Sequence, residues 1–121
     1  KFVRLSVFSG ITAVTRCPLG PIREDPELLA MLQAAAMETM KVAASSGVPL
    51  PAEVLGEMMT MVKGLPPNAK SSMLEDLERG KRLELPWLSG AVVRIGAAHD
   101  VNTPIHRFIN TVLQPHVNGR S

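Results

Sequence analysis

The fold class follows from residues 25–47, which read DPELLAMLQAAAMETMKVAASSG. Asp25 is a favourable N-cap, Pro26 suits the first helical position, and the acidic Glu27 follows near the positive end of the helix dipole. Apolar residues then recur at the spacing of one helical face as far as Ala43. Gly47 provides a C-terminal cap, so this stretch predicts one long helix.

The segment before this helix is also predicted to be helical. A helix over residues 2–15 is predicted by apolar groups at helical spacing, namely Val3, Val7, Ile11 and Val14. Residues 16–21 must end that helix, because two prolines and a glycine fall close together there. We therefore expect an irregular connection between the two helices.

After residue 47, prolines, glycines and serines mark where further helices begin and end. Pro51 opens a helix that extends to Val62, and a loop follows over residues 64–68. Either Ser71 or Ser72 then begins a short helix, because serine is a favoured N-cap.

Two more helices complete the chain. Pro86 fits the first turn of one of them. Thr103 is placed to cap the last helix, with Pro104 at its first position, and Pro115 stops it. No segment shows sustained period-2 alternation between turn signals. The predicted fold is therefore all-α, a single compact multi-helix domain over residues 1–121.

The composition limits the function classes. Apolar residues make up 45% of the chain and aromatic residues 3%, so we expect a core of aliphatic side chains and Met rather than a Met-rich partner groove. A net charge of +2, with no basic run longer than Lys81-Arg82, argues against nucleic-acid binding. No apolar run approaches the length of a membrane span. Cys17 is the only cysteine, so no internal disulfide can form and a cytoplasmic location is expected.

Few residues indicate chemistry by themselves. His99, His106 and His116 are not spaced as a metal pair on one helix face, so we interpret them as surface or capping residues and expect no metal site. No serine has a His/Asp constellation beside it, which gives hydrolysis no support. Cys17 is more simply interpreted as a small buried hydrophobe than as a reactive thiol.

The most informative segment is residues 70–90, which read KSSMLEDLERGKRLELPWLSG. Its recurring features are a Ser-Ser-Met triplet and, at fixed distances after it, Asp76, Arg82, Glu84, Leu88-Ser89-Gly90 and Thr103-Pro104. In these features and their spacing the chain resembles the C-terminal domain of the 2-dehydropantoate 2-reductase (ketopantoate reductase) family. The resemblance implies a helical fold of the 6-phosphogluconate dehydrogenase C-terminal-like type.

The resemblance covers essentially the whole chain and implies particular roles. Lys1 stands where the family has the Lys of a Trp-x-Lys motif, the catalytic acid that protonates the alkoxide formed from a 2-keto acid. Glu84 would bind the substrate hydroxyl or hold Lys1 in place. Ser72 would help to bind the substrate carboxylate; the alternative is that Ser71 and Ser72 only cap a helix.

Two positions depart from the family pattern, which commonly has Asn four and eight residues after that Lys. Leu5 and Ser9 occupy them here, on the same helical face as Lys1, and would contact the substrate. These departures from the family pattern favour a more apolar 2-keto acid as one candidate substrate. The alternative is a non-catalytic dimerisation or regulatory module descended from the same family.

The resemblance also implies partners. The full-length enzyme would reduce ketopantoate or a related 2-keto acid, as in pantothenate biosynthesis, on the route to coenzyme A. Its NADPH would be bound mainly by an N-terminal Rossmann domain, whereas no Gly-x-Gly-x-x-Gly turn occurs in this chain. The chain is expected to be a C-terminal part that is inactive alone, and a homodimer is a further expectation.

Overall fold

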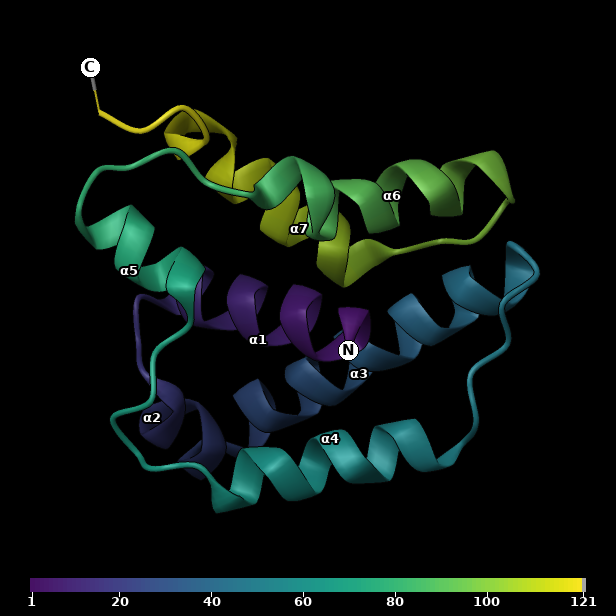
Figure 1. Cartoon of the computed structure of the whole chain (residues 1–121), viewed down its shortest axis with the longest axis horizontal. Coiled ribbons are helices and arrows are strands. Elements are labelled where there is room, and N and C mark those ends of the chain that lie inside the picture. Colours follow the sequence, from purple (N-terminus) through teal and green to yellow (C-terminus); the bar gives the residue numbers. More distant parts are fainter. Residues whose placement is uncertain (121) are drawn as a thin grey trace.

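The structure is a computed structural model that describes residues 1–120, which form helices joined by loops and contain no strand (Figure 1). The α-helices are α1 (Phe2–Thr15), α2 (Leu19–Glu24), α3 (Pro26–Ser45), α4 (Glu53–Gly64), α5 (Ser72–Glu78), α6 (Ser89–Ala98) and α7 (Pro104–Leu113). Two 3-10 helices are η1 (Leu85–Trp87) and η2 (Gln114–His116). The predicted all-α fold is confirmed.

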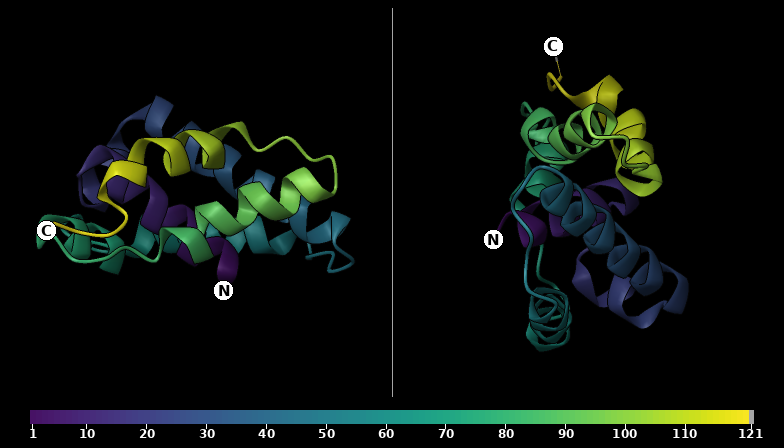
Figure 2. Two further views of the ribbon diagram at one scale, coloured as in Figure 1. Left: turned by 90° about the horizontal axis from the view of Figure 1, so that it is seen from above. Right: turned by 90° about the vertical axis from the view of Figure 1, so that its right-hand side faces the viewer.

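Helix α1 lies at the centre, between α4 on one side and α6 with α7 on the other (Figures 1 and 2). Its side chains Val3, Val7 and Ile11 fall one turn apart and are buried, as the helical spacing predicts. Gly10 permits the close approach of α7, because a Cβ added there would lie 3.0 Å from Cδ1 of Ile109. The core is aliphatic as expected.

The ends of α3 form as predicted. The Asp25 carboxylate accepts the backbone N–H groups of Glu27 and Leu28 at 2.9 Å and 3.2 Å. Gly47 has a φ of 89°, the left-handed conformation that glycine adopts without strain, and it ends the helix.

The segment between α1 and α3 is more regular than predicted. Arg16 does end α1, but α2 begins at Leu19 and includes both Gly20 and Pro21. Pro21 is tolerated because it lies in the first turn, where a backbone N–H would have no helical acceptor. The N–H groups of Leu19 and Gly20 instead donate to the loop carbonyls of Ala69 and Pro67, at 2.9 Å and 2.8 Å.

The start of α6 also differs from the prediction. Pro86 belongs to the separate turn η1, and α6 begins three residues later, at Ser89. Leu88 separates the two with φ −113° and ψ −103°, which is outside the helical region. Local spacing could not reveal this break, because both sides of it have helical character.

The N-terminus of α7 has a different capping group from the predicted one. Thr103 occupies the N-cap position, but its side chain makes no capping hydrogen bond. The Glu38 carboxylate of α3 accepts the N–H groups of Ile105 and His106 instead. Sequence reasoning missed this cap because the acceptor comes from a distant helix.

Candidate functional site

One face of α1 carries three of the predicted site residues. Lys1, Leu5 and Ser9 are four residues apart, so their side chains follow one another along the helix. The backbone N–H of Leu5 donates to the Lys1 carbonyl at 3.0 Å, so helical hydrogen bonding begins at Lys1. Lys1 and Leu5 are exposed, whereas Ser9 is buried where α5 packs against α1.

The adjacent serines at the start of α5 have different surroundings. Ser71 is buried; its Oγ accepts the backbone N–H of Leu74 at 3.0 Å and also hydrogen-bonds with Thr12 Oγ1 of α1. Ser72 is exposed in the first turn of α5. Ser71 is therefore the helix cap, and the cap leaves the Ser72 side chain free for another role.

Glu84 is placed at the surface by its neighbours in the chain. Leu83 and Leu85 are both buried, and the Leu83 N–H donates to the Val117 carbonyl at 2.9 Å. The Glu84 carbonyl accepts the N–H of Trp87 at 3.0 Å, which closes η1. Anchors on both sides hold this backbone, while the side chain between them remains exposed.

These segments meet at a hollow of about 110 Å³, which we call the α1–α5 hollow. Its lining consists of Leu5, Ser9, Ser72, Met73, Asp76, Glu84 and Leu88. Four of the five predicted site residues thus share one cavity. Within residues 1–120 the one ion pair joins Lys70 and Glu78, so neither carboxylate of this hollow has a cationic partner there.

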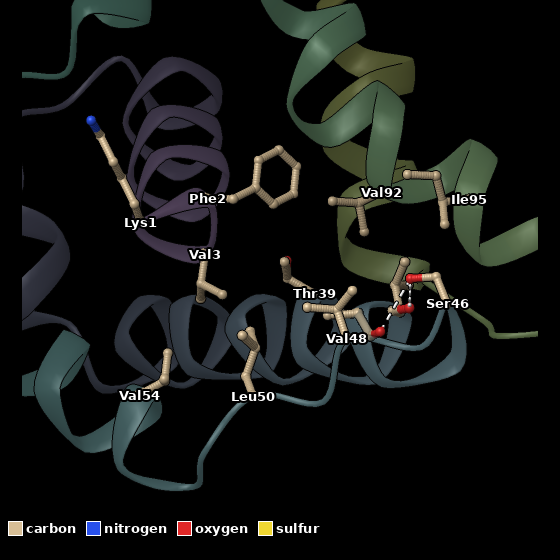
Figure 3. Close-up of a pocket in the computed structure, with 12 residues that line it drawn as sticks. Lys1, Phe2, Val3, Thr39, Ser46, Val48, Leu50, Val54, Val92 and Ile95 are labelled. Carbon is tan, nitrogen blue, oxygen red and sulfur yellow. Dashed lines mark hydrogen bonds between the residues drawn. The ribbon is translucent and has the colours of Figure 1, made fainter.

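Lys1 lines two neighbouring hollows rather than this one. The first, of about 190 Å³, is the α1–α4 hollow, lined by Lys1, Arg4, Leu5, Phe8, Met61 and Leu65. The second is apolar and larger, about 380 Å³, and Figure 3 shows the Lys1 side chain directed away from its residues Val48 and Leu50. Leu5 lines both the α1–α4 hollow and the α1–α5 hollow, so the two hollows adjoin at Leu5 while Lys1 and Glu84 line different ones.

Sequence reasoning missed this apolar hollow altogether. Phe2, Val48 and Ile95 are exposed hydrophobic residues that line it from α1, the loop after α3, and α6 (Figure 3). No local spacing could indicate it, because its residues come together only through the packing of distant helices.

The interpretation of the histidines was wrong for His106, which is fully buried in α7. Its Nε2 lies 2.8 Å from Thr39 Oγ1 and 2.9 Å from the Ala35 carbonyl, and its Nδ1 lies 3.1 Å from Ser89 Oγ. A neutral ring with the proton on Nε2 satisfies these partners, since Nδ1 then accepts from Ser89. Burial lowers the pKa of His106, which favours that neutral form.

Residues 1–120 contain neither a clustered set of metal ligands nor a helix able to span a membrane. No group of three or more His, Cys, Asp or Glu side chains is arranged there to hold a metal ion. None of the helices described is both long enough and apolar enough to cross a membrane.

This helical architecture recurs as one part of larger oxidoreductases. A dimeric ketopantoate reductase from Staphylococcus aureus matches 95% of this chain and 40% of its own with a TM-score of 0.86, at 23% identity. D-mandelate dehydrogenase, solved with NADH and anilino(oxo)acetate, matches 95% of this chain and 64% of its own with a TM-score of 0.84, at 19% identity. At these identities the likeness establishes the shared fold.

Sequence comparison identifies the family. The family described as "Ketopantoate reductase PanE/ApbA C terminal" matches residues 1–117, so the chain belongs to it. The 2-dehydropantoate 2-reductase of Archaeoglobus fulgidus is 32% identical over 109 residues, which cover 90% of this chain. The match spans only 36% of that relative's length, so this chain corresponds to one part of it.

Proposed function

We propose that this chain forms the substrate-binding and proton-donating part of an NADPH-dependent reductase of ketopantoate or a related 2-keto acid. The observation that carries the proposal is the α1–α5 hollow, in which Leu5, Ser9, Ser72 and Glu84 converge from three separate segments. The resemblance to the ketopantoate reductase family assigns these four residues to the substrate site, and they line one hollow although they come from segments far apart in the chain. Membership of the ketopantoate reductase family supports the same reaction.

The chemistry requires a hydride at the carbonyl carbon and a proton at the carbonyl oxygen. Nicotinamide supplies the hydride when NADPH is bound by an N-terminal Rossmann domain. We expect a reductase of this kind to be cytoplasmic. As the carbon–oxygen π bond breaks, negative charge develops on the oxygen. The Lys1 ammonium is proposed to stabilise this charge and to donate the proton that gives the 2-hydroxy acid.

The remaining residues are proposed to hold the substrate. The hydroxyls of Ser9 and Ser72 can donate hydrogen bonds to the carboxylate, and Leu5 contacts the carbon skeleton. Glu84 and Lys1 line adjoining hollows that share Leu5, so Glu84 can accept a substrate hydroxyl or attract the ammonium once substrate bridges the two hollows. Closure against the N-terminal domain would complete this arrangement.

The test is steady-state kinetics of the full-length protein with Lys1→Ala and Glu84→Ala. Loss of a general acid should reduce kcat/KM by roughly a hundredfold to ten-thousandfold for Lys1→Ala. Lys41→Ala and Glu57→Ala, which remove exposed charges on α3 and α4, are the matched controls and should keep activity. Wild-type activity in both Lys1→Ala and Glu84→Ala would eliminate the proposal.

A second candidate function is a non-catalytic dimerisation module. Phe108 and Val112 lie one turn apart on α7 and are 51% and 41% exposed, and neither lines the hollows described above. An exposed apolar pair of this kind favours contact with another protein surface. Sedimentation of the wild-type chain against Phe108→Ser tests it: a dimer that dissociates in the variant supports association through α7.

A further inference from the structure

We infer that the α1–α4 hollow receives the side chain of the keto acid and selects a hydrocarbon side chain over a hydroxylated one. This inference rests on the proposed function and adds the substrate class to it. The hollow lies beside the α1–α5 hollow, and Leu5 forms part of both walls. A substrate held by Ser9 and Ser72 on one side of Leu5 can therefore extend its side chain to the other side.

Four of the six residues that line the α1–α4 hollow are apolar. Leu5 and Phe8 come from α1, and Met61 and Leu65 come from the end of α4. None of these four side chains can donate or accept a strong hydrogen bond, so a hydroxyl placed among them would lose its hydration without compensation. A methyl or methylene group would gain from the same transfer out of water.

The wall contributed by α4 is held in place. The backbone N–H of Leu65 donates to the Met61 carbonyl at 3.1 Å, and the Leu65 carbonyl accepts from Arg23 Nη1 at 2.7 Å. Arg23 Nη1 also donates to the Val62 carbonyl at 2.9 Å, so one guanidinium caps the C-terminus of α4. A fixed wall preserves the shape of the hollow and so can discriminate between side chains of different shape.

The other two residues that line the hollow are cationic. Lys1 and Arg4 both line it, and Arg4 reaches from α1 to α4, where its Nη1 lies 3.7 Å from Met61 Sδ. The two charges complement a keto acid, which is an anion, and attract it to an otherwise apolar recess. An uncharged hydrocarbon would gain nothing from them, so the combination favours an acid with an apolar tail.

The size of the hollow agrees with a short side chain. Its volume is about 190 Å³. Sites for drug-sized ligands measure roughly 300–1,000 Å³, so this recess suits a branched chain of a few carbons rather than a larger group. The proposed substrate is thus a 2-keto acid such as 4-methyl-2-oxopentanoate, and Leu5, Met61 and Leu65 determine the specificity.

The first experiment uses the isotope-labelled full-length protein, because closure against the N-terminal domain is proposed to complete the site. Titration with 4-methyl-2-oxopentanoate should shift the NMR signals of Leu5, Met61 and Leu65, with an apparent Kd lower than that for the hydroxylated 2-dehydropantoate. Leu5→Asn should raise the Kd for the hydrocarbon acid about tenfold, the lower end of what a single apolar group contributes in a pocket. Met37→Asn is the matched control, because Met37 and Leu5 are both 47% exposed and Met37 lines none of the three hollows.

A second variant guards against a change in folding. Met61→Gln alters the opposite wall of the hollow, and circular dichroism spectra check that both variants remain helical. The inference is overturned if the signals around the hollow do not move, if both acids bind equally well, or if Leu5→Asn behaves like Met37→Asn.

Kinetics of the full-length protein distinguish a failure of this inference from a failure of the proposed reductase function on which it rests. Reduction of 4-methyl-2-oxopentanoate with a higher kcat/KM than 2-dehydropantoate supports both. Preference for 2-dehydropantoate, unaltered by Leu5→Asn, overturns the inference and leaves the reductase function standing. Turnover of neither acid with NADPH overturns the reductase function, while the titration still reports independently on what the hollow prefers.

Discussion

The carboxylate of Glu38, in the middle of α3, accepts the backbone N–H of His106 in the first turn of α7 at 3.0 Å. It also accepts the N–H of Ile105 at 2.9 Å. N–H groups in the first turn of a helix have no intrahelical acceptor, and Thr103 does not cap them with its side chain. A buried carboxylate from another helix therefore replaces a local cap and joins α3 to α7.

Removing this carboxylate should destabilise the domain. We expect Glu38→Ala to lower the free energy of unfolding by about 1–2 kcal/mol, the range for loss of a helix cap. Glu38→Gln should cost less, because the amide oxygen still accepts a hydrogen bond. Urea denaturation measures both, with the exposed Glu57→Ala as control. Equal stabilities for Glu38→Ala and the control would show that the cap contributes nothing.

The buried His106 should make stability depend on pH. Burial lowers its pKa below the ordinary value of 6.5, so the unfolded chain binds this proton more readily than the folded one. The contribution of His106 to the free energy of unfolding is therefore complete above pH 6.5 and is lost as the pH falls below that value. The free energy of unfolding should change by at most about 1.4 kcal/mol per pH unit in this range.

Urea titrations at a series of pH values between neutral and mildly acid check this dependence. His106→Gln should flatten it, whereas the exposed His99→Gln should leave it unchanged. Glu38 accepts the backbone N–H of His106, so Glu38→Gln tests whether this neighbour causes the slope, and we expect the slope to persist in that variant. A slope that disappears in Glu38→Gln and persists in His106→Gln would assign the effect to the carboxylate.

Local features of the fold were predictable from sequence, and long-range contacts were not. The cap at Asp25, the glycine at 47 and the buried stripe of α1 depend on residues close together in the chain. The burial of His106 and the cap from Glu38 depend on partners more than sixty residues away. Spacing along one helix carries no information about such partners.

In the candidate site, too, local features were predictable from sequence and long-range contacts were not. Helical periodicity is enough to place Leu5 and Ser9 on one face of α1. The family resemblance, and no local pattern, implied that Ser72 and Glu84 belong to the same site as this face. In the structure all of these residues line the α1–α5 hollow. Neither source indicated the α1–α4 hollow, because Met61 and Leu65 are set against α1 only by the packing of α4.

Two glycines should respond in opposite directions to the same substitution. A Cβ on Gly20 would lie 2.8 Å from Cβ of Pro67 and 2.9 Å from its carbonyl oxygen, and this backbone cannot move easily. We expect Gly20→Ala to destabilise the domain by roughly 1–3 kcal/mol through overpacking. Gly56, the fourth residue of α4, has nothing within 4 Å of its Cβ position, so Gly56→Ala should stabilise the domain by about 1 kcal/mol. Thermal unfolding measures both. Stabilisation by Gly20→Ala would contradict the contact at Pro67, and destabilisation by Gly56→Ala would contradict the open space around Gly56.

Ser71 should matter for stability rather than for substrate. Ser71→Ala removes the cap of Leu74 and the partner of the Thr12 hydroxyl, so we expect a loss of about 1–2 kcal/mol in urea denaturation. Thr12 Oγ1 keeps its hydrogen bond to the Phe8 carbonyl at 2.7 Å, which limits the penalty. A stability equal to that of the wild type would mean that water replaces the cap without cost.

Ser72 should give the opposite result, which makes the two neighbours controls for each other. Its side chain is exposed and lines the α1–α5 hollow, so Ser72→Ala should leave the free energy of unfolding within about 0.5 kcal/mol of the wild type. In the full-length enzyme the same substitution should raise KM for the keto acid with little change in kcat, because a hydrogen bond to the carboxylate is made equally in the ground and transition states. A drop in kcat at unchanged KM would instead place Ser72 next to the reacting carbonyl. An enzyme indifferent to Ser72→Ala would leave substrate binding in this hollow to Ser9 and Glu84.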